Sequence, residues 1–185
     1  MEYLVWLVVL VAAPAVFFFN LLVSRRNQAD NAAASIDVYL KQRFDLIPNL
    51  VATVQGYMAH ERDTLVQLTE MRARALAENQ SHADKVAMDA QVTRALGSVR
   101  VAVEGYPALK ASQNFLQLQG TLNDVEEKIA AARRNFNGSA TDYNNGVQMF
   151  PANLLAGMLG FETRPLFIIA ETERQNPDVN RLMAG

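Results

Sequence analysis

Apolar positions divide the chain into one unbroken amino-terminal stretch and a series of periodic segments. Residues 3–23 form a charge-free, mostly apolar run of about 21 residues, long enough at 1.5 Å per residue to cross the roughly 30 Å core of a bilayer. A cleaved signal peptide would begin with a basic segment, whereas the basic pair here, Arg25 and Arg26, follows the apolar run. The pattern therefore predicts a retained transmembrane anchor over residues 3–24.

The residues that flank this stretch predict its orientation. Tyr3 and Trp6 are suited to one interfacial belt, and Arg25 and Arg26 mark the other side. By the positive-inside rule we expect an outside amino terminus and a cytoplasmic body, with a single pass through the membrane. The arginine pair is suited to bind anionic lipid headgroups. The simpler interpretation is a topology signal alone, and the same two residues can serve both roles.

Behind the anchor, apolar positions recur every three or four residues, as in helices that pack side by side. The first stripe runs from Ala29 to Tyr57 and is interrupted only by Arg43. Pro48 lies inside it and predicts a kink, because proline removes a backbone donor. The apolar phase ends near residues 56–60, so we expect a second helix over residues 61–78 and a third that stops at Gly105-Tyr106-Pro107.

The fourth periodic segment is the longest. Its stripe extends from Phe115 to Phe150, about 36 residues or roughly 54 Å of helix. A short apolar piece around Leu155 follows, then a last apolar cluster at residues 166–169 and a polar end. We therefore expect three parts: the anchor over residues 3–24, a helical bundle over residues 25–161, and an apolar segment with a polar tail over residues 162–185.

Composition supports an all-α fold and excludes several kinds of site. Glycine and proline are scarce, at 9 and 6 residues, and the absence of cysteine excludes disulfides and thiolate metal sites. A net charge of −2 argues against nucleic-acid binding through bulk electrostatics. We expect no cofactor and no metal.

Two sequence blocks carry a family resemblance. The first is SIDVYLKQRFDLIPNLV at residues 35–51, and the second begins with YPALKASQNF at residues 106–115 and continues to FPAN at residues 150–153. Together they resemble the LemA family of bacterial proteins, from the anchor to about Phe161. The resemblance implies a membrane helix followed by an antiparallel helical bundle, here of four helices, with no established enzymatic activity. A magnetosome-biogenesis member of that family hints at membrane organisation.

The sequence contains no convincing catalytic motif. His60-Glu61 is the sole adjacent pair of histidine and acid, but a zincin helix needs a second histidine where Thr64 stands. We interpret the pair as a polar break between helices and expect no catalytic residue.

Arg43 is the most unusual polar residue, because it occupies an apolar stripe position where an unpaired charge is costly. Either it snorkels or pairs with an acid from another helix or subunit, with Glu104 and Asp142 as candidates, or the kink at Pro48 turns it into solvent. An asparagine-rich group also has alternative interpretations. It forms an inter-helix hydrogen-bond ladder or a binding edge, or it lies on a solvated helix face. Its members are Asn135, Asn137, Asn144, Asn145 and Asn153.

The features together favour a non-enzymatic, membrane-anchored scaffold that self-associates and organises membrane or partner proteins. Its expected partners are membrane lipids, a second copy of the chain bound through the bundle and the apolar segment, and a membrane protein. The alternative is a membrane-tethered sensor or adaptor whose bundle binds a small ligand or a partner helix. The structural and interface candidates are Arg43, Pro48, Asn49, Tyr143, Phe150, Leu155, Phe161 and Phe167.

Overall fold

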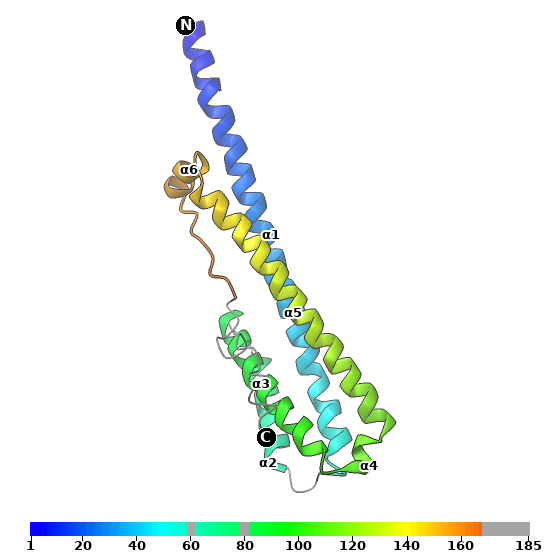
Figure 1. Cartoon of the computed structure of the whole chain (residues 1–185). Helices are drawn as coiled ribbons and strands as arrows, with labels where there is room; N and C mark the ends of the chain where they lie inside the picture. The colour runs from blue at the N-terminus through cyan, green and yellow to red at the C-terminus, as the bar shows by residue number, and fades with distance from the viewer. Residues whose placement is uncertain (59–61, 78–81, 168–185) are drawn as a thin grey trace, which may run out of the picture. The chain divides into compact units, whose positions relative to one another are not determined.

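The computed structural model describes residues 1–58, 62–77 and 82–167 (Figure 1). Over these ranges the chain is helical and has no β-strand, so the all-α prediction is confirmed. The helices are α1 (Glu2–Val54), α2 (Arg62–Ala75), α3 (His82–Val103), α4 (Pro107–Lys110), α5 (Gln113–Gln148) and α6 (Ala152–Leu159).

The predicted helices and breaks agree closely with the observed ones. α5 contains 36 residues and continues through Asn144-Asn145-Gly146, as its apolar phase predicts. The predicted anchor and the first stripe are joined in one helix of 53 residues, which passes through Pro48 without ending. The short α4 was not predicted. His60, Glu61, the expected turn at residues 79–81 and the end of the chain from residue 168 lie outside the described residues.

The stripe positions inside the helices are buried or half-buried, whereas two positions past the end of a helix are exposed. In α1 the stripe positions from Ile36 to Val54 have relative exposures of at most 3%. Tyr57 and Phe150 were assigned to stripes but are 45% and 78% exposed. Both assignments were wrong for the same reason: α1 ends at Val54 and α5 at Gln148, and a helical phase does not continue beyond its helix.

The contacts divide the chain into two compact units. Unit 1 comprises residues 1–29 and 136–185, and unit 2 comprises residues 30–135. The prediction of separate parts at residues 3–24, 25–161 and 162–185 concerns function and stays a prediction.

Unit 2 contains the expected four long helical segments in alternating directions. Asp45 of α1 approaches Arg72 of α2, while Asp37 of the same α1 stretch pairs with Lys85 of α3. Arg100 near the end of α3 contacts Asn123 of α5. Farther along both helices Arg43 of α1 pairs with Asp89 of α3, so α1 and α3 run in one direction. Asp89 also pairs with Arg133, so α5 runs opposite to α3. α2 connects the end of α1 to the start of α3 and runs opposite to both, so short connections suffice between consecutive helices.

In unit 1 the last turns of α5 lie antiparallel to the first part of α1. Arg25 donates a hydrogen bond of 2.8 Å to the carbonyl oxygen of Asp142, one turn before Gly146. A Cβ on Gly146 would lie 3.2 Å from the Leu22 side chain, so the two helices approach closely there. The chain then turns through the cis peptide bond Phe150–Pro151 into α6, beside the end of α5 (Figure 1).

None of the helices in residues 1–58, 62–77 and 82–167 has both the length and the apolar character that a membrane span requires.

Candidate functional site

The core of unit 2 contains a buried charge cluster centred on Arg43. This side chain is 3% exposed, and one of its terminal nitrogens donates to Asp89 at 2.9 Å and to the hydroxyl of Thr93 at 3.0 Å. The other terminal nitrogen lies 2.6 Å from a carboxylate oxygen of Glu126. Arg43 of α1 thus joins α3 and α5 through charge-assisted hydrogen bonds.

Asp89 connects a second arginine to the same cluster. Its other carboxylate oxygen accepts a hydrogen bond of 2.9 Å from Arg133, and its side chain is 3% exposed. Arg43, Arg133, Asp89 and Glu126 balance in charge, which offsets much of the cost of removing the two most buried groups from water. The cluster links α1, α3 and α5 of unit 2.

The prediction that Arg43 pairs with an acid of another helix is confirmed, and the alternative that it turns into solvent is wrong. The two acids proposed as partners were also wrong. Glu104 pairs with Lys110, and it is the backbone carbonyl of Asp142 that accepts a hydrogen bond, from Arg25. Asp89 was missed although it shares the three-four spacing of the buried α3 positions Val92, Val99 and Val103.

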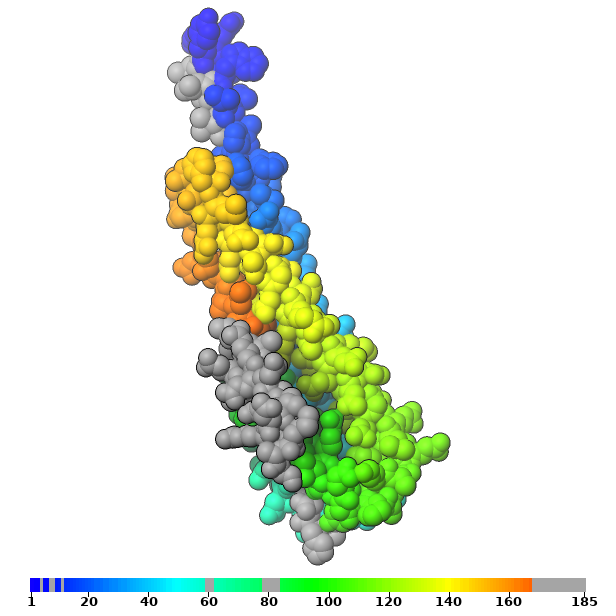
Figure 2. Space-filling view, in the orientation of Figure 1, coloured from blue at the N-terminus to red at the C-terminus, as the bar shows by residue number. Residues whose placement is uncertain are grey.

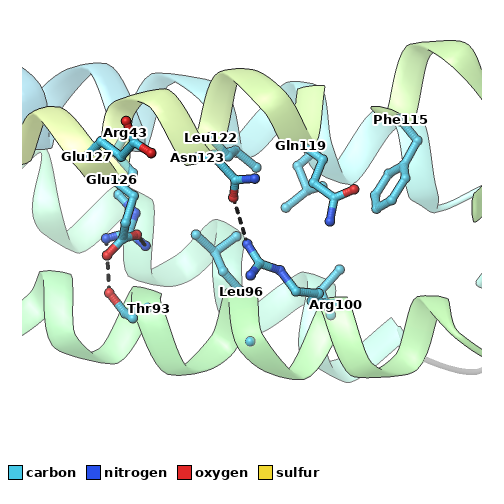
Figure 3. A pocket seen from close by; sticks show the side chains of 13 residues that line it. Arg43, Thr93, Leu96, Arg100, Phe115, Gln119, Leu122, Asn123, Glu126 and Glu127 are labelled. Atoms are coloured by element: carbon cyan, nitrogen blue, oxygen red, sulfur yellow. Dashed lines mark hydrogen bonds and ion pairs between the residues drawn. The ribbon is translucent and has the colours of Figure 1, made fainter. Parts of the chain in front are cut away.

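A groove of about 500 Å³ lies beside this cluster, between α3 and α5 of unit 2. Figure 3 shows Arg43 and Glu126 at one end of the groove and Phe115 at the other. Arg100 reaches across it and donates to the side-chain oxygen of Asn123 at 2.9 Å. The further apolar lining is supplied by Leu50, Leu96, Val99 and Leu122.

In unit 1 two asparagines of α5 hold an extended segment of the chain, residues 161–167. The Asn144 amide donates to the carbonyl of Arg164 and accepts from its N–H, both at 2.8 Å. Asn137 does the same with the backbone of Phe167, at 2.9 and 2.8 Å. We call this arrangement the asparagine clasp.

The dimensions of helix and extended chain explain the clasp. The two asparagines are seven residues apart, about 10.5 Å along a helix, and the two backbone groups are three extended residues apart, about 10 Å. An aromatic residue precedes each asparagine. Phe136 packs against Phe167 with ring centroids 5.0 Å apart, and the Arg164 guanidinium lies 5.9 Å from the Tyr143 ring centre.

The clasp gives a mixed outcome for the asparagine-rich group. Asn137 and Asn144 form a hydrogen-bond ladder, but its partner is an extended backbone rather than a second helix. Asn135, Asn145 and Asn153 are exposed, as expected for a solvated face. The repeated pairing of an aromatic residue with asparagine, at a spacing of seven, is the sequence signal that distinguishes the two clasp residues.

A model of the LemA family matches residues 32–180, well over half of the chain. The chain belongs to the LemA family. The resemblance inferred from the two sequence blocks is therefore confirmed.

The relatives of this LemA-family chain include LemA and magnetosome proteins. Protein LemA of Metamycoplasma hominis is 28% identical over 163 residues, which cover 88% of this chain and 74% of that protein. Magnetosome protein MamQ of Magnetospirillum gryphiswaldense is 22% identical over 169 residues, covering 78% of this chain and 62% of MamQ. Magnetosome protein MamQ 2 of Paramagnetospirillum magneticum is 32% identical over 73 residues, 40% of this chain and 27% of that protein. The chain thus spans less than two thirds of these two MamQ proteins.

The other predicted site residues of the LemA-family chain occupy both units. Trp6 is 71% exposed and Tyr3 is 90% exposed, while Tyr143 is 2% exposed beneath Arg164. The remaining candidates fall into two groups. The exposed ones are Arg26, Pro48, Asn49 and Phe150, and the half-buried ones are Arg25, Leu155, Phe161 and Phe167.

Within the described ranges, no group of three acidic or histidine side chains is placed to hold a metal ion.

Proposed function

We propose that this LemA-family chain is a membrane-attached scaffold without catalytic activity. Residues 3–23 anchor it in a single pass through a bacterial inner membrane, with the amino terminus outside and unit 2 in the cytoplasm. The bundle of unit 2 then serves as a rigid platform for partner proteins near the membrane surface.

The exposure of apolar side chains in residues 3–19 carries the proposal. Trp6, Leu10 and Phe17 are 71, 72 and 62% exposed, and no charge occurs between Tyr3 and Val23. Contiguous exposed apolar surface of this kind marks a membrane or protein contact, because each Å² costs about 25 cal/mol in water. Since no described helix met the requirements of a membrane span, the support for the anchor comes from its sequence and this exposure.

The chemistry of unit 2 supports a structural rather than a catalytic role. Its most buried charged groups, Arg43 and Asp89, are committed to each other and to neighbouring helices. A general acid or base instead needs access to a substrate. The charge cluster therefore fits a platform that keeps one shape.

Self-association is the second part of the proposal. The anchor contains the small residues Ala12, Ala13 and Ala15, and such residues let membrane helices approach closely. One anchor per subunit gains avidity only when subunits cluster. Sizing the detergent-extracted protein by mass photometry tests this part: we expect oligomers, whereas a monomer at every concentration contradicts it.

Flotation of carbonate-washed membranes tests attachment. We expect the full chain to float with the lipid, and a variant with Leu10→Arg and Phe17→Arg to stay in the soluble fraction. A matched variant with Val66→Arg and Val101→Arg changes two exposed apolar residues of unit 2 and should float like the parent. A parent chain that is released by the wash contradicts the anchor.

The groove beside Arg43 favours a second candidate, an adaptor that binds a small ligand or a partner helix. Its volume of about 500 Å³ and its apolar lining with a few polar groups are typical of ligand pockets. A metabolite screen by thermal shift tests this candidate. We expect a stabilising compound to lose its effect in a Leu96→Trp variant, in which the larger side chain occupies the groove.

A further inference from the structure

The surface around α6 is apolar and uncharged. No charged residue occurs from Met149 to Phe161. Phe150 and Met158 are 78 and 83% exposed, and Met149, Leu154 and Leu159 are between 52 and 63% exposed. Figure 2 shows this part of unit 1, α6 and the segment that follows (orange), at the surface beside the end of α5 (yellow).

Contacts within unit 1 place α6 next to the end of the proposed anchor. The ring of Phe161, just after α6, packs edge-to-face on Phe19 with centroids 6.2 Å apart. The register of α5 against α1 agrees, because Asp142 contacts Arg25 and Gly146 lies against Leu22.

This register gives α6 a defined depth if residues 3–23 are in the bilayer. Arg25 marks the level of the headgroups, and Phe19 is six residues closer to the hydrocarbon, about 9 Å along the helix. Interfacial helices bury their apolar face to about 5–10 Å in the headgroup and acyl boundary. The apolar surface of α6 thus lies at the depth that such a helix occupies.

The chain also holds α6 in place. Gly160 ends the helix with a left-handed φ of 71°, and the N–H of Phe161 returns to the carbonyl of Ala156. Glu162 is the first charged residue after α6. Two residues later, the side chain of Asn144 in the clasp binds the backbone of Arg164. The apolar element is therefore tethered on both sides, to α5 before it and to the clasp after it.

We infer that α6, with Met149 and Phe150, is a second membrane contact that lies in the lipid interface beside the anchor. The inference rests on the proposed anchor and goes beyond it, because it assigns lipid, rather than a second copy of the chain, to the apolar segment. The ligand is the headgroup and upper acyl region of the bilayer. Two contacts in one unit would fix the orientation of unit 1 relative to the membrane plane, which a single helix cannot do.

A single fluorescent label tests this contact, because the chain has no cysteine of its own. Met158→Cys on α6 is labelled with an environment-sensitive dye, and the full chain is reconstituted in phosphatidylcholine and phosphatidylglycerol vesicles. Val101→Cys, an exposed apolar position of unit 2 at 74%, is the matched control. We expect blue-shifted emission at position 158 that lipids with shallow nitroxides quench, and water-like, unquenched emission at position 101.

Two results would overturn the inference while the anchor survives. One is water-like emission at position 158 on vesicles that carry the chain through flotation. The other is blue-shifted emission that the nitroxide lipids do not quench and that depends on protein density, since a second copy then covers α6. A chain that does not float at all contradicts the anchor and the α6 contact together.

Discussion

Polar side chains link neighbouring segments in both units. In unit 2 these side chains are mainly charged, whereas in unit 1 two neutral asparagine amides form the links. Arg43 and Asp89 are each 3% exposed and are held by charge-assisted bonds between helices. Asn137 and Asn144 instead form hydrogen bonds with an extended segment. Each side-chain amide binds the N–H and the carbonyl of a single residue, Phe167 or Arg164.

The difference follows from what each polar side chain binds. A buried ion pair is tolerable in a bundle where Glu126 at 51% exposure keeps part of the cluster hydrated. The backbone N–H and carbonyl groups of an extended segment have no helical partners of their own. A neutral amide satisfies one such donor and one acceptor together, and the clasp supplies it twice.

Removing one member of the ionic cluster should have the largest effect. Asp89→Ala leaves Arg43 without its buried acidic partner, which costs about 3–5 kcal/mol of unfolding free energy. Urea denaturation of the full chain in detergent measures this loss.

A rescue variant separates pairing from simple loss of packing. Arg43→Met combined with Asp89→Leu removes both buried charges and should recover most of the stability, since Arg133 and Glu126 are exposed enough to be hydrated. A double variant as unstable as Asp89→Ala would show that the ions are not the reason for the loss.

Breaking the clasp should cost less and act locally. Asn144→Leu leaves the N–H and carbonyl of Arg164 without their partner, a loss of about 1–3 kcal/mol. Hydrogen exchange should report faster exchange at the Arg164 amide, with the amides of unit 2 unchanged. Asn145→Leu changes an exposed neighbour and is the control; equal effects of the two would remove the clasp from the account.

Two glycines of α5 provide a smaller comparison. Gly138→Ala meets no atom within 4 Å and should stabilise the helix by about 0.5–1 kcal/mol. At Gly146 the new methyl would lie 3.2 Å from Leu22, so the same change should gain less or destabilise. Thermal melts of the two variants measure the difference, and identical shifts contradict the close approach of α5 and α1.

The smallest effect is expected at the exposed pair of Lys41 and Asp45. These side chains are 67 and 43% exposed and lie four residues apart on α1, 2.6 Å from nitrogen to oxygen. Such pairs contribute about 0.3–0.5 kcal/mol, less at high salt. Asp45→Ala should therefore hardly change the urea midpoint, and a loss as large as that of Asp89→Ala would undermine the distinction between buried and exposed ions.

Helices and breaks could be predicted from the sequence because apolar spacing is a local property. The stripes located α5 correctly and placed Arg43 at a core position of α1, although they left open whether its side chain is buried. They extended too far at Tyr57 and Phe150, because periodicity tells which face is buried but not where a helix ends.

The partners in both polar arrangements were harder to predict. Glu104 and Asp142 were proposed for Arg43, but the register between α1 and α3 that brings Asp89 to it is set by the packing of whole helices. The clasp joins side chains to backbone groups of an extended segment, and backbone groups leave no mark in a sequence. Asp89 and the repeated aromatic–asparagine pairs were visible, but only the fold shows what they contact.

Labelling of intact cells tests the central claim most directly, namely that residues 3–23 cross the membrane once. Glu2→Cys and Ala90→Cys place a thiol before the anchor and on the exposed surface of α3, in a chain without other cysteines. With an impermeant thiol reagent, we predict labelling at position 2 in intact cells and at position 90 only after lysis. Equal reactivity of the two positions in intact cells, whether both label or neither does, would contradict a single pass.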